Sequence, residues 1–292
     1  MSLNNPEHPG PALLAREAQA RHGPVADQLD GQTVGPGEML LAGDRFMLRT
    51  LTGYAYLYQR GAGVIVDRSP GADPAEEQLW LNGSVYAAIA AINGFLPLHA
   101  SAVVWQGGAY AFTGPSGAGK STLAAALGGH AMPLLCDDTL VLDISDPQRI
   151  LCLPGHKRLK LTAQAVALTG AAPQEKVAAL VDKHYAAPPG GVLNAVVPLR
   201  QLIFLADDEV PQIEPIGGAQ RLACLNDDHY TADIFAMARR LDLAGRFALI
   251  AAIAPHIAMS RFARPRDTAR FAETTALIAA TLKQGVPPCL PR

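Results

Sequence analysis

A glycine-rich segment, Gly114-Pro115-Ser116-Gly117-Ala118-Gly119-Lys120-Ser121, constrains this chain more than any other part of its sequence. It fits the pattern G-x-x-x-x-G-K-[S/T] in full, between apolar runs typical of a strand and of a helix. Glycines let the backbone curl so that successive N–H groups point at one anion, and a helix start adds positive potential. The segment therefore predicts a phosphate-binding loop; the alternative is a glycine turn that merely begins a helix.

The residues at the end of this loop predict the ligand. Lys120 would reach the β- and γ-phosphates of a nucleoside triphosphate, and the Ser121 hydroxyl would bind Mg²⁺. Thr122 is a further candidate for a phosphate contact. We therefore expect ATP and Mg²⁺ as cofactors. The expected binding residues are Gly114, Pro115, Ser116, Gly117, Ala118, Gly119, Lys120, Ser121 and Thr122.

A predicted hairpin leads into the loop. Residues 101–105 and 109–113 are apolar runs joined by Gln-Gly-Gly, which is typical of two antiparallel strands and a turn. A three-residue turn places His99 opposite Pro115, and we expect a two-residue turn to shift the partner to Ser116. Both registers put His99 beside the loop, where it could orient a phosphate or a hydroxyl. The alternative is a polar residue that is merely satisfied at a strand start.

Two adjacent acids, Asp137 and Asp138, end the next apolar run, residues 132–136. If that run is a strand parallel to residues 109–113, both acids lie at the sheet edge that carries the loop, where ligands of open α/β sheets bind. One acid could hold Mg²⁺ and the other could accept the proton of an attacking hydroxyl, with the division of roles open. The alternative is a turn with two exposed acids.

Composition limits the class of protein. The 292 residues are 49% hydrophobic, enough for a sizeable core, and the formal net charge of −2 gives no reason to expect nucleic acid or an anionic membrane as partner. We expect no signal peptide and no membrane span, because the longest apolar stretch, residues 85–105, is interrupted by polar residues. Four scattered cysteines predict free thiols rather than a zinc site, and a cytoplasmic protein.

Three regions follow from the patterns along the chain. We expect residues 1–36, rich in Pro, Gly and Ala, to be flexible apart from a short helix over residues 12–21. Residues 37–97 form a small β-rich region, with strand-like runs at 39–41, 46–48, 54–58 and 63–66, followed by a helix over 78–95. Residues 98–292 form the phosphate-loop domain. It would have further strands at 140–142, 150–153 and 196–205, a helix over 161–168 and a mostly helical stretch over 219–282.

Three segments in the same order resemble the HPr kinase/phosphorylase family, most closely its short members. They are residues 98–103 with His99, residues 113–122 with the loop, and residues 135–138 with the two acids. The resemblance implies an α/β fold of the P-loop kinase type related to phosphoenolpyruvate carboxykinase. It also implies transfer of the γ-phosphate of ATP to a serine or threonine hydroxyl. His99, Asp137 and Asp138 would act at that hydroxyl, and Lys120 at the phosphates.

The resemblance also bears on partners. Short members are associated with peptide tailoring, including kinases similar to those that phosphorylate lasso-peptide precursors, so it implies a peptide or small protein substrate. The family tends to assemble, which implies a homo-oligomer. The longer family's glycine-rich segment after the acids is missing, which argues against HPr as substrate and against a phosphorylase reaction. Alternatives are a small-molecule kinase with the same site, an HPr serine kinase, and a nucleotide-dependent sensor without transfer activity.

Basic residues outside these segments are further candidates. Lys183 could contact phosphate, and Arg264 or Arg266 could stabilise the transferring charge. The alternative for Arg266 is an ion pair with Asp267 at a helix start. The basic run at residues 156–160 would either receive an acidic peptide or form a solvated edge.

Overall fold

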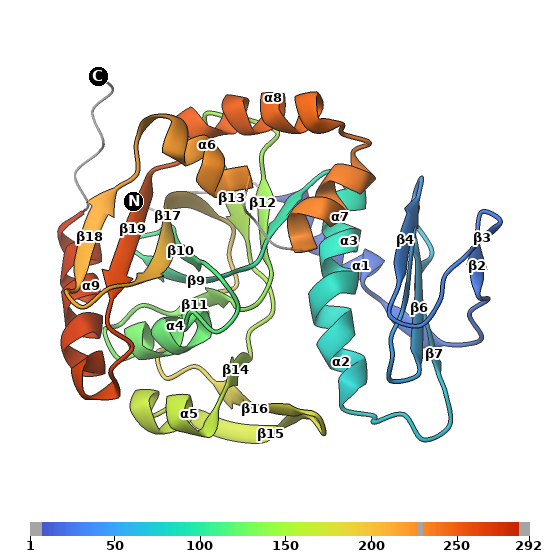
Figure 1. Cartoon of the computed structure of the whole chain (residues 1–292), viewed down its shortest axis with the longest axis horizontal. Helices are drawn as coiled ribbons and strands as arrows, with labels where there is room; N and C mark the ends of the chain where they lie inside the picture. The colour runs from blue at the N-terminus through green and yellow to red at the C-terminus, as the bar shows by residue number, and fades with distance from the viewer. Residues whose placement is uncertain (1–7, 227–229, 286–292) are drawn as a thin grey trace.

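The computed structural model describes residues 8–226 and 230–285, and over these residues the chain is a mixed α/β protein with several sheets (Figure 1). One five-stranded sheet comes from the N-terminal part, and a larger nine-stranded sheet comes from the rest of the chain. A helical segment lies between the two sheets (Figure 1). None of the helices in the described part has the length and apolar character needed to cross a membrane.

The N-terminal sheet contains the four strands that the sequence predicts. Its order is β1-β7-β6-β5-β4, and all pairs except β1 with β7 are antiparallel. The bounds are β1 Ala20–His22, β4 Met39–Ala42, β5 Arg45–Arg49, β6 Tyr54–Gln59 and β7 Gly63–Arg68, with a separate hairpin of β2 Gln28–Leu29 and β3 Gln32–Thr33. Tyr54, Tyr56 and Tyr58 alternate along β6 and are all buried, because they share one face of the strand.

The described part of the segment expected to be flexible is folded, which corrects the expectation for residues 1–36. Helix α1, Pro9–Glu17, begins and ends a few residues earlier than predicted, and β1 pairs with β7. Leu14 packs into the main hydrophobic cluster, and the carboxylate of Glu17 is only 1% exposed. The proline- and glycine-rich composition did not reveal these tertiary contacts. Residues 1–7 lie outside the described residues.

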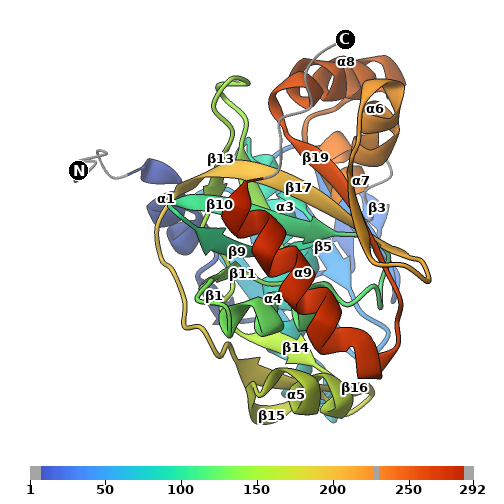
Figure 2. The ribbon, with the colours of Figure 1, turned by 90° about the vertical axis from the view of Figure 1, so that its left-hand side faces the viewer.

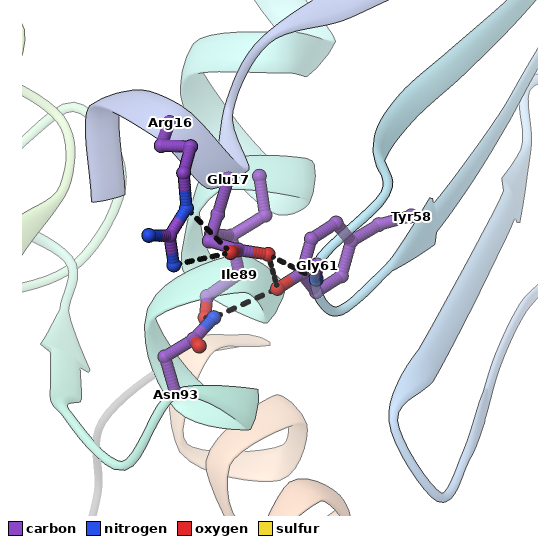
Figure 3. Close-up of polar contacts among 6 residues, drawn as sticks. All are labelled: Arg16, Glu17, Tyr58, Gly61, Ile89 and Asn93. Carbon is purple, nitrogen blue, oxygen red and sulfur yellow. Dashed lines mark hydrogen bonds and ion pairs between the residues drawn. The ribbon is translucent and has the colours of Figure 1, made fainter. Parts of the chain in front are cut away.

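The carboxylate of Glu17 joins α1 to two other elements (Figure 3). It accepts hydrogen bonds from the Tyr58 hydroxyl at 2.9 Å and from the backbone N–H of Gly61 at 2.7 Å, and it pairs with Arg16 at 3.0 Å. Asn93 donates to the Tyr58 hydroxyl at 2.7 Å and so extends the network to the end of the central helical segment. Burial alone would raise the pKa of Glu17, but these donors together lower it.

The predicted helix over residues 78–95 is present but interrupted. Helix α2, Glu76–Trp80, continues into a π-helical turn η1, Leu81–Val85, and then into α3, Tyr86–Ile92. Gly83 departs from helical geometry, with φ −100° and ψ −109°. Because α3 is apolar all round, it is buried between the two sheets (Figure 1).

The large sheet carries the functional region. Its strands run in the order β11-β9-β10-β17-β13-β12-β8, with β19 beside β17 and β18 beside β19. The bounds are β8 Leu96–Leu98, β9 Ala100–Trp105, β10 Gly108–Thr113, β11 Leu134–Cys136, β12 Leu140–Asp143, β13 Leu151–Leu153, β17 Val197–Asp207, β18 Gln212–Pro215 and β19 Met259–Arg264. In β9, Ala102 and Val104 join the cluster around α3, whereas Val103 joins the cluster around α4, so both faces are buried.

Helices cover the two faces of this sheet. Helices α4, Lys120–Gly128, and α9, Phe271–Gln284, lie on one face, as Figure 2 shows. Helices α3 and α7, Tyr230–Ala238, lie on the other face, with α6, Gly218–Asn226, and α8, Leu243–Ile253, near the same end. A small sheet of β14 Leu159–Leu161, β16 Val181–Ala187 and β15 Ala172–Ala178 lies with α5, Ala163–Thr169, at the edge of the molecule.

Several strands differ from the sequence-based expectations, β15, β16 and β19 most clearly. The mostly helical stretch expected over residues 219–282 contains β19, which pairs in parallel with β17. Hairpin β15–β16 was not predicted, because β15 is mostly exposed and contains Pro, Gln, Glu and Lys. The partner of β19 lies more than fifty residues away along the chain, so no local pattern indicates the pairing.

The predicted boundary between residues 97 and 98 falls inside strand β8. One hydrophobic cluster contains residues from both sides of that boundary. The division into an N-terminal region and a phosphate-loop domain stays a prediction. None of the three described cysteines forms a disulfide, and Cys289 lies outside the described residues.

Candidate functional site

The glycine-rich segment connects β10 to α4, in the strand–loop–helix order that the sequence predicts. Gly119 precedes the first residue of α4 with a φ of 86°, a left-handed conformation that favours glycine. A Cβ atom at this position would lie 2.9 Å from Nη2 of Arg264, so a larger residue would displace the end of that side chain. The left-handed backbone is therefore the stronger reason for glycine at this position.

Lys120 lies over the loop rather than in solvent. Its side chain is 7% exposed, and its ammonium group donates hydrogen bonds to the carbonyl oxygens of Gly114 at 2.8 Å and Pro115 at 3.3 Å. The loop carbonyls thus hold a positive charge at the start of α4, where the helix dipole also favours an anion.

A cavity of about 760 Å³ surrounds this loop. It is lined by most residues named from the sequence: residues 116–122 of the loop, His99, Asp138, Lys183, Arg264 and Arg266. Asp137 lies behind the cavity wall and is fully buried. The fold therefore gathers candidates from five separate segments at one place.

The hairpin register places His99 at the loop but corrects which loop residue lies opposite it. Trp105 pairs with Gly108 across a two-residue turn, and Ala100 pairs with Thr113. Extending this register by one residue puts His99 opposite Gly114, not opposite Ser116, because shortening the turn moves the partner toward the N-terminus. The Thr113 hydroxyl donates to the carbonyl of His99 at 3.2 Å, which fixes the backbone there.

Strand β11 places both acids at the same sheet edge as the loop. It is antiparallel to β9, which is antiparallel to β10, so β11 runs parallel to β10 as the argument from sequence required. Asp137 accepts hydrogen bonds from the Ser101 hydroxyl at 2.5 Å and from the N–H of Lys160 at 3.1 Å. The nearby Ser121 hydroxyl lowers the pKa of Asp137, as the Ser101 hydroxyl does. Burial raises the pKa of Asp137, and the neighbouring charge of Asp138 raises it further.

Asp138 differs from its neighbour in conformation and charge. Its φ is 72°, unusual for a residue with a side chain, and the N–H of Thr139 donates to the carbonyl of Asp137 across it at 2.9 Å. Its carboxylate pairs with the Lys160 ammonium at 2.7 Å. Burial would raise the pKa of Asp138, but Lys160, with smaller contributions from His99 and Lys183, lowers it. The cavity-facing acid is therefore held in its charged form.

Sequence reasoning missed two residues of this site, Ser101 and Lys160. Ser101 lies in the middle of an apolar strand, and its only sequence signal is that it is a polar residue among buried ones. Lys160 belongs to the basic run at residues 156–160. The sequence suggested one shared role for this run, either binding an acidic peptide or forming a solvated edge. The strand period of two instead separates its members, so that Lys160 faces the cavity.

The rest of the basic run is neither an exposed peptide-binding surface nor a solvated edge. Lys157 donates to the carbonyl oxygens of Leu135 and Leu193, and burial lowers its pKa to about 8. Arg158 lies over the ring of Tyr185, 3.8 Å from its centre, and pairs with Glu175. These two residues support β11 and the small sheet.

The two candidate arginines, Arg264 and Arg266, both lie near the loop but make different contacts. Arg264, at the end of β19, is 8% exposed and donates to the carbonyl of Ala118 at 2.8 Å. Arg266 is exposed and pairs with Asp207 at 2.7 Å, not with Asp267 as the alternative proposed. Asp267 instead accepts a hydrogen bond from the N–H of Ala269. Arg264 thus supports the loop, whereas Arg266 leaves positive charge at the cavity rim.

The oxygen atoms near the loop fit magnesium better than a transition metal. Within the described residues, no group of three or more His, Cys, Asp and Glu side chains is placed to hold a metal ion. The acids and the Ser121 hydroxyl place hard oxygen atoms beside the glycine-rich loop. Mg²⁺ is commonly held by one or two such groups, with phosphates and water completing its coordination.

Comparison with protein-family models and with curated proteins finds no match for this chain. Among solved structures, it is similar to the HPr(Ser) kinase/phosphatase from Coxiella burnetii, at 14% sequence identity and a TM-score of 0.33. The match covers 64% of this chain and 94% of that protein. This structural relationship is distant, and the function proposed below rests on the site itself.

Proposed function

We propose that the protein is a Mg²⁺- and ATP-dependent kinase that transfers the γ-phosphate to a serine or threonine hydroxyl of a peptide or small protein. One observation carries the proposal: a glycine-rich loop of the phosphate-binding type, a buried acid near Ser121 and a charged acid facing the cavity meet at one sheet edge. A protein that only binds nucleotide has no need of a charged acid that faces the cavity.

The two acids differ enough to divide the roles that the sequence left open. Ser121 and Asp137 would hold Mg²⁺, which would neutralise charge on the β- and γ-phosphates. Asp137 orients the Ser121 hydroxyl from behind the cavity wall. Lys120 and the loop N–H groups would stabilise the transferring phosphoryl group from the side of the loop.

Asp138 is the group that would accept the hydroxyl proton. It faces the cavity and is held in its charged form by Lys160. His99 lines the same cavity and lowers the pKa of Asp138, so it lies on the acceptor side and helps to position the hydroxyl. Lys183 and Arg266 add positive charge around the transferring group.

The acceptor is proposed on the resemblance of the sequence and on the size of the cavity. About 760 Å³ leaves room for a peptide segment beside a nucleotide. The resemblance favours a precursor peptide of the lasso type. A small-molecule kinase would use the same loop and acids, so the acceptor has to be identified by experiment.

The decisive experiment incubates the protein with γ-labelled ATP, Mg²⁺ and a degenerate library of serine- and threonine-containing peptides, followed by mass spectrometry. Wild-type protein should label peptides, Lys120→Ala should lose nucleotide binding and labelling, and Asp138→Asn should bind nucleotide but not transfer. Asn suits the left-handed conformation at position 138, so this variant preserves the backbone. Labelling of a metabolite in a cell extract, with no peptide labelled, would contradict a peptide acceptor.

A further inference from the structure

The strand order of the large sheet distinguishes the two ends of the cavity. Strand β11, with the acids, lies two strands from β10 on one side, and β19 lies two strands from β10 on the other. Ser121 lies near Asp137, so the γ-phosphate and its Mg²⁺ would face the acids. The nucleoside would then extend the other way, where Thr122, Pro265 and Phe271 line the cavity.

The acid end of the cavity contains an apolar recess. Its surface comes from the partly exposed Leu79 and Trp80 of α2 and Val181 of hairpin β15–β16, and the fully buried Val177 lies behind it. These four residues, which we call the acid-side recess, line the same cavity as Asp138. The N–H of Ala179, at the hairpin tip, donates to Asp73 at 2.7 Å, which ties the hairpin to the segment that leads into α2. The recess therefore has two walls from distant parts of the chain.

Gly83 lies between the recess and Asp138 and carries no side chain. At Gly83, where η1 departs from helical geometry, an added Cβ would lie 3.6 Å from Oδ2 of Asp138. A group held in the recess would therefore lie next to Asp138 with no side chain from position 83 in between.

We propose that the acid-side recess binds a large apolar side chain next to the hydroxyl that receives the phosphate. This inference rests on the proposed kinase function and adds the acceptor preference: a serine or threonine flanked by Leu, Ile, Met or Phe. The physical reason is that the recess offers apolar surface on both walls, and burying an apolar side chain there releases water. The apolar contact also holds the neighbouring hydroxyl at the acid.

The test compares wild-type protein with the double variant Leu79→Ala/Val181→Ala, using γ-labelled ATP and two matched peptides. One peptide carries Leu beside its only serine, and the other carries Gly at the same place. The variant should raise KM for the Leu peptide about tenfold, because several buried methylene contacts are lost, and should leave kcat little changed. KM for the Gly peptide should not change.

Binding measurements separate this site from the nucleotide site. The double variant should bind Mg²⁺-ATP and Mg²⁺-tripolyphosphate as wild type does, which also shows that it is folded. Phe271→Ala, at the other end, should weaken ATP binding and leave tripolyphosphate binding unchanged. If the double variant weakens ATP but not tripolyphosphate, the recess holds the nucleobase and the inference is wrong.

Two further outcomes distinguish this inference from the proposed function. Wild-type protein that phosphorylates Leu and Gly peptides equally well overturns the acceptor preference and leaves the kinase function in place. Wild-type protein that hydrolyses ATP but phosphorylates no peptide in a degenerate library overturns the proposed function, and the inference fails with it.

Discussion

The ammonium group of Lys160 lies 2.7 Å from Oδ2 of Asp138, in a wall of the cavity that also contains the glycine-rich loop. The side chains are 8% and 21% exposed, so little water screens the pair. This contact lowers the pKa of Asp138 against the opposing effect of burial. An acid in contact with a lysine thus remains charged while it faces the cavity.

Replacing Lys160 by Met should separate catalysis from nucleotide binding. Without its partner, Asp138 has a higher pKa, so the acidic limb of the pH–rate profile should move to higher pH. The transfer rate near neutral pH should fall about tenfold or more. Lys160→Arg should retain most activity because the charge remains. A large loss of Mg²⁺-ATP affinity with an unmoved acidic limb would instead assign Lys160 to the phosphates.

Ser101→Ala should change the magnesium requirement. The variant removes the 2.5 Å hydrogen bond that fixes the Asp137 carboxylate, so the acid holds Ser121 less well. The Mg²⁺ concentration at half-maximal rate should rise about tenfold, consistent with losing one buried hydrogen bond of about 1–2 kcal/mol. ATP affinity at saturating Mg²⁺ should stay the same. Ser84→Ala, a cavity residue in another segment, serves as the control, and an equal effect there would refute the role of Ser101.

Glu17→Gln should destabilise the protein without affecting transfer. The substitution removes the charge that pairs with Arg16 and places an amide beside two donors, the Tyr58 hydroxyl and the Gly61 N–H. The free energy of unfolding should fall by about 2 kcal/mol in urea titrations. Arg16→Ala, which removes a largely exposed partner, should cost less than about 1 kcal/mol. A loss of activity in folded Glu17→Gln would show that α1 contributes to the site.

His156 should make stability depend on pH. Burial is the main cause that lowers its pKa to about 4, so the folded protein holds it neutral, whereas the unfolded chain protonates it near pH 6.5. Its contribution to stability is complete above pH 6.5 and is lost as the pH falls toward 4. Between pH 7 and pH 5, wild type should lose about 1–2 kcal/mol more than His156→Phe, which cannot titrate. Parallel pH curves for the two proteins would contradict this assignment.

Several parts of the fold follow from local sequence. The loop from Gly114 to Ser121, the hairpin before it and the acids after β11 each combine residue types that few local structures accommodate. The strands β4–β7 follow from short apolar and aromatic runs separated by turns. These predictions succeed because glycine conformation, strand alternation and turn chemistry act within a few residues.

Other parts depend on contacts between distant segments. Strand β19 lies in a region of helical character, and its pairing with β17 and β18 makes it a strand. Helix α1 is held by Glu17, whose partners come from the β6–β7 hairpin. The left-handed conformation of Asp138 and the two-residue turn before β10 decide where the second acid and His99 lie.

The sequence by itself thus determined the strand–loop–helix segment around residues 114–121 and named His99, Asp137 and Asp138 as candidates, because each belongs to a local pattern. The tertiary structure decided how those residues differ. It buries Asp137 behind Ser121 and Ser101, and it brings Lys160 from β14 to Asp138. The physical reason is that burial and charge pairing, which set the pKa of each acid, depend on segments more than twenty residues away.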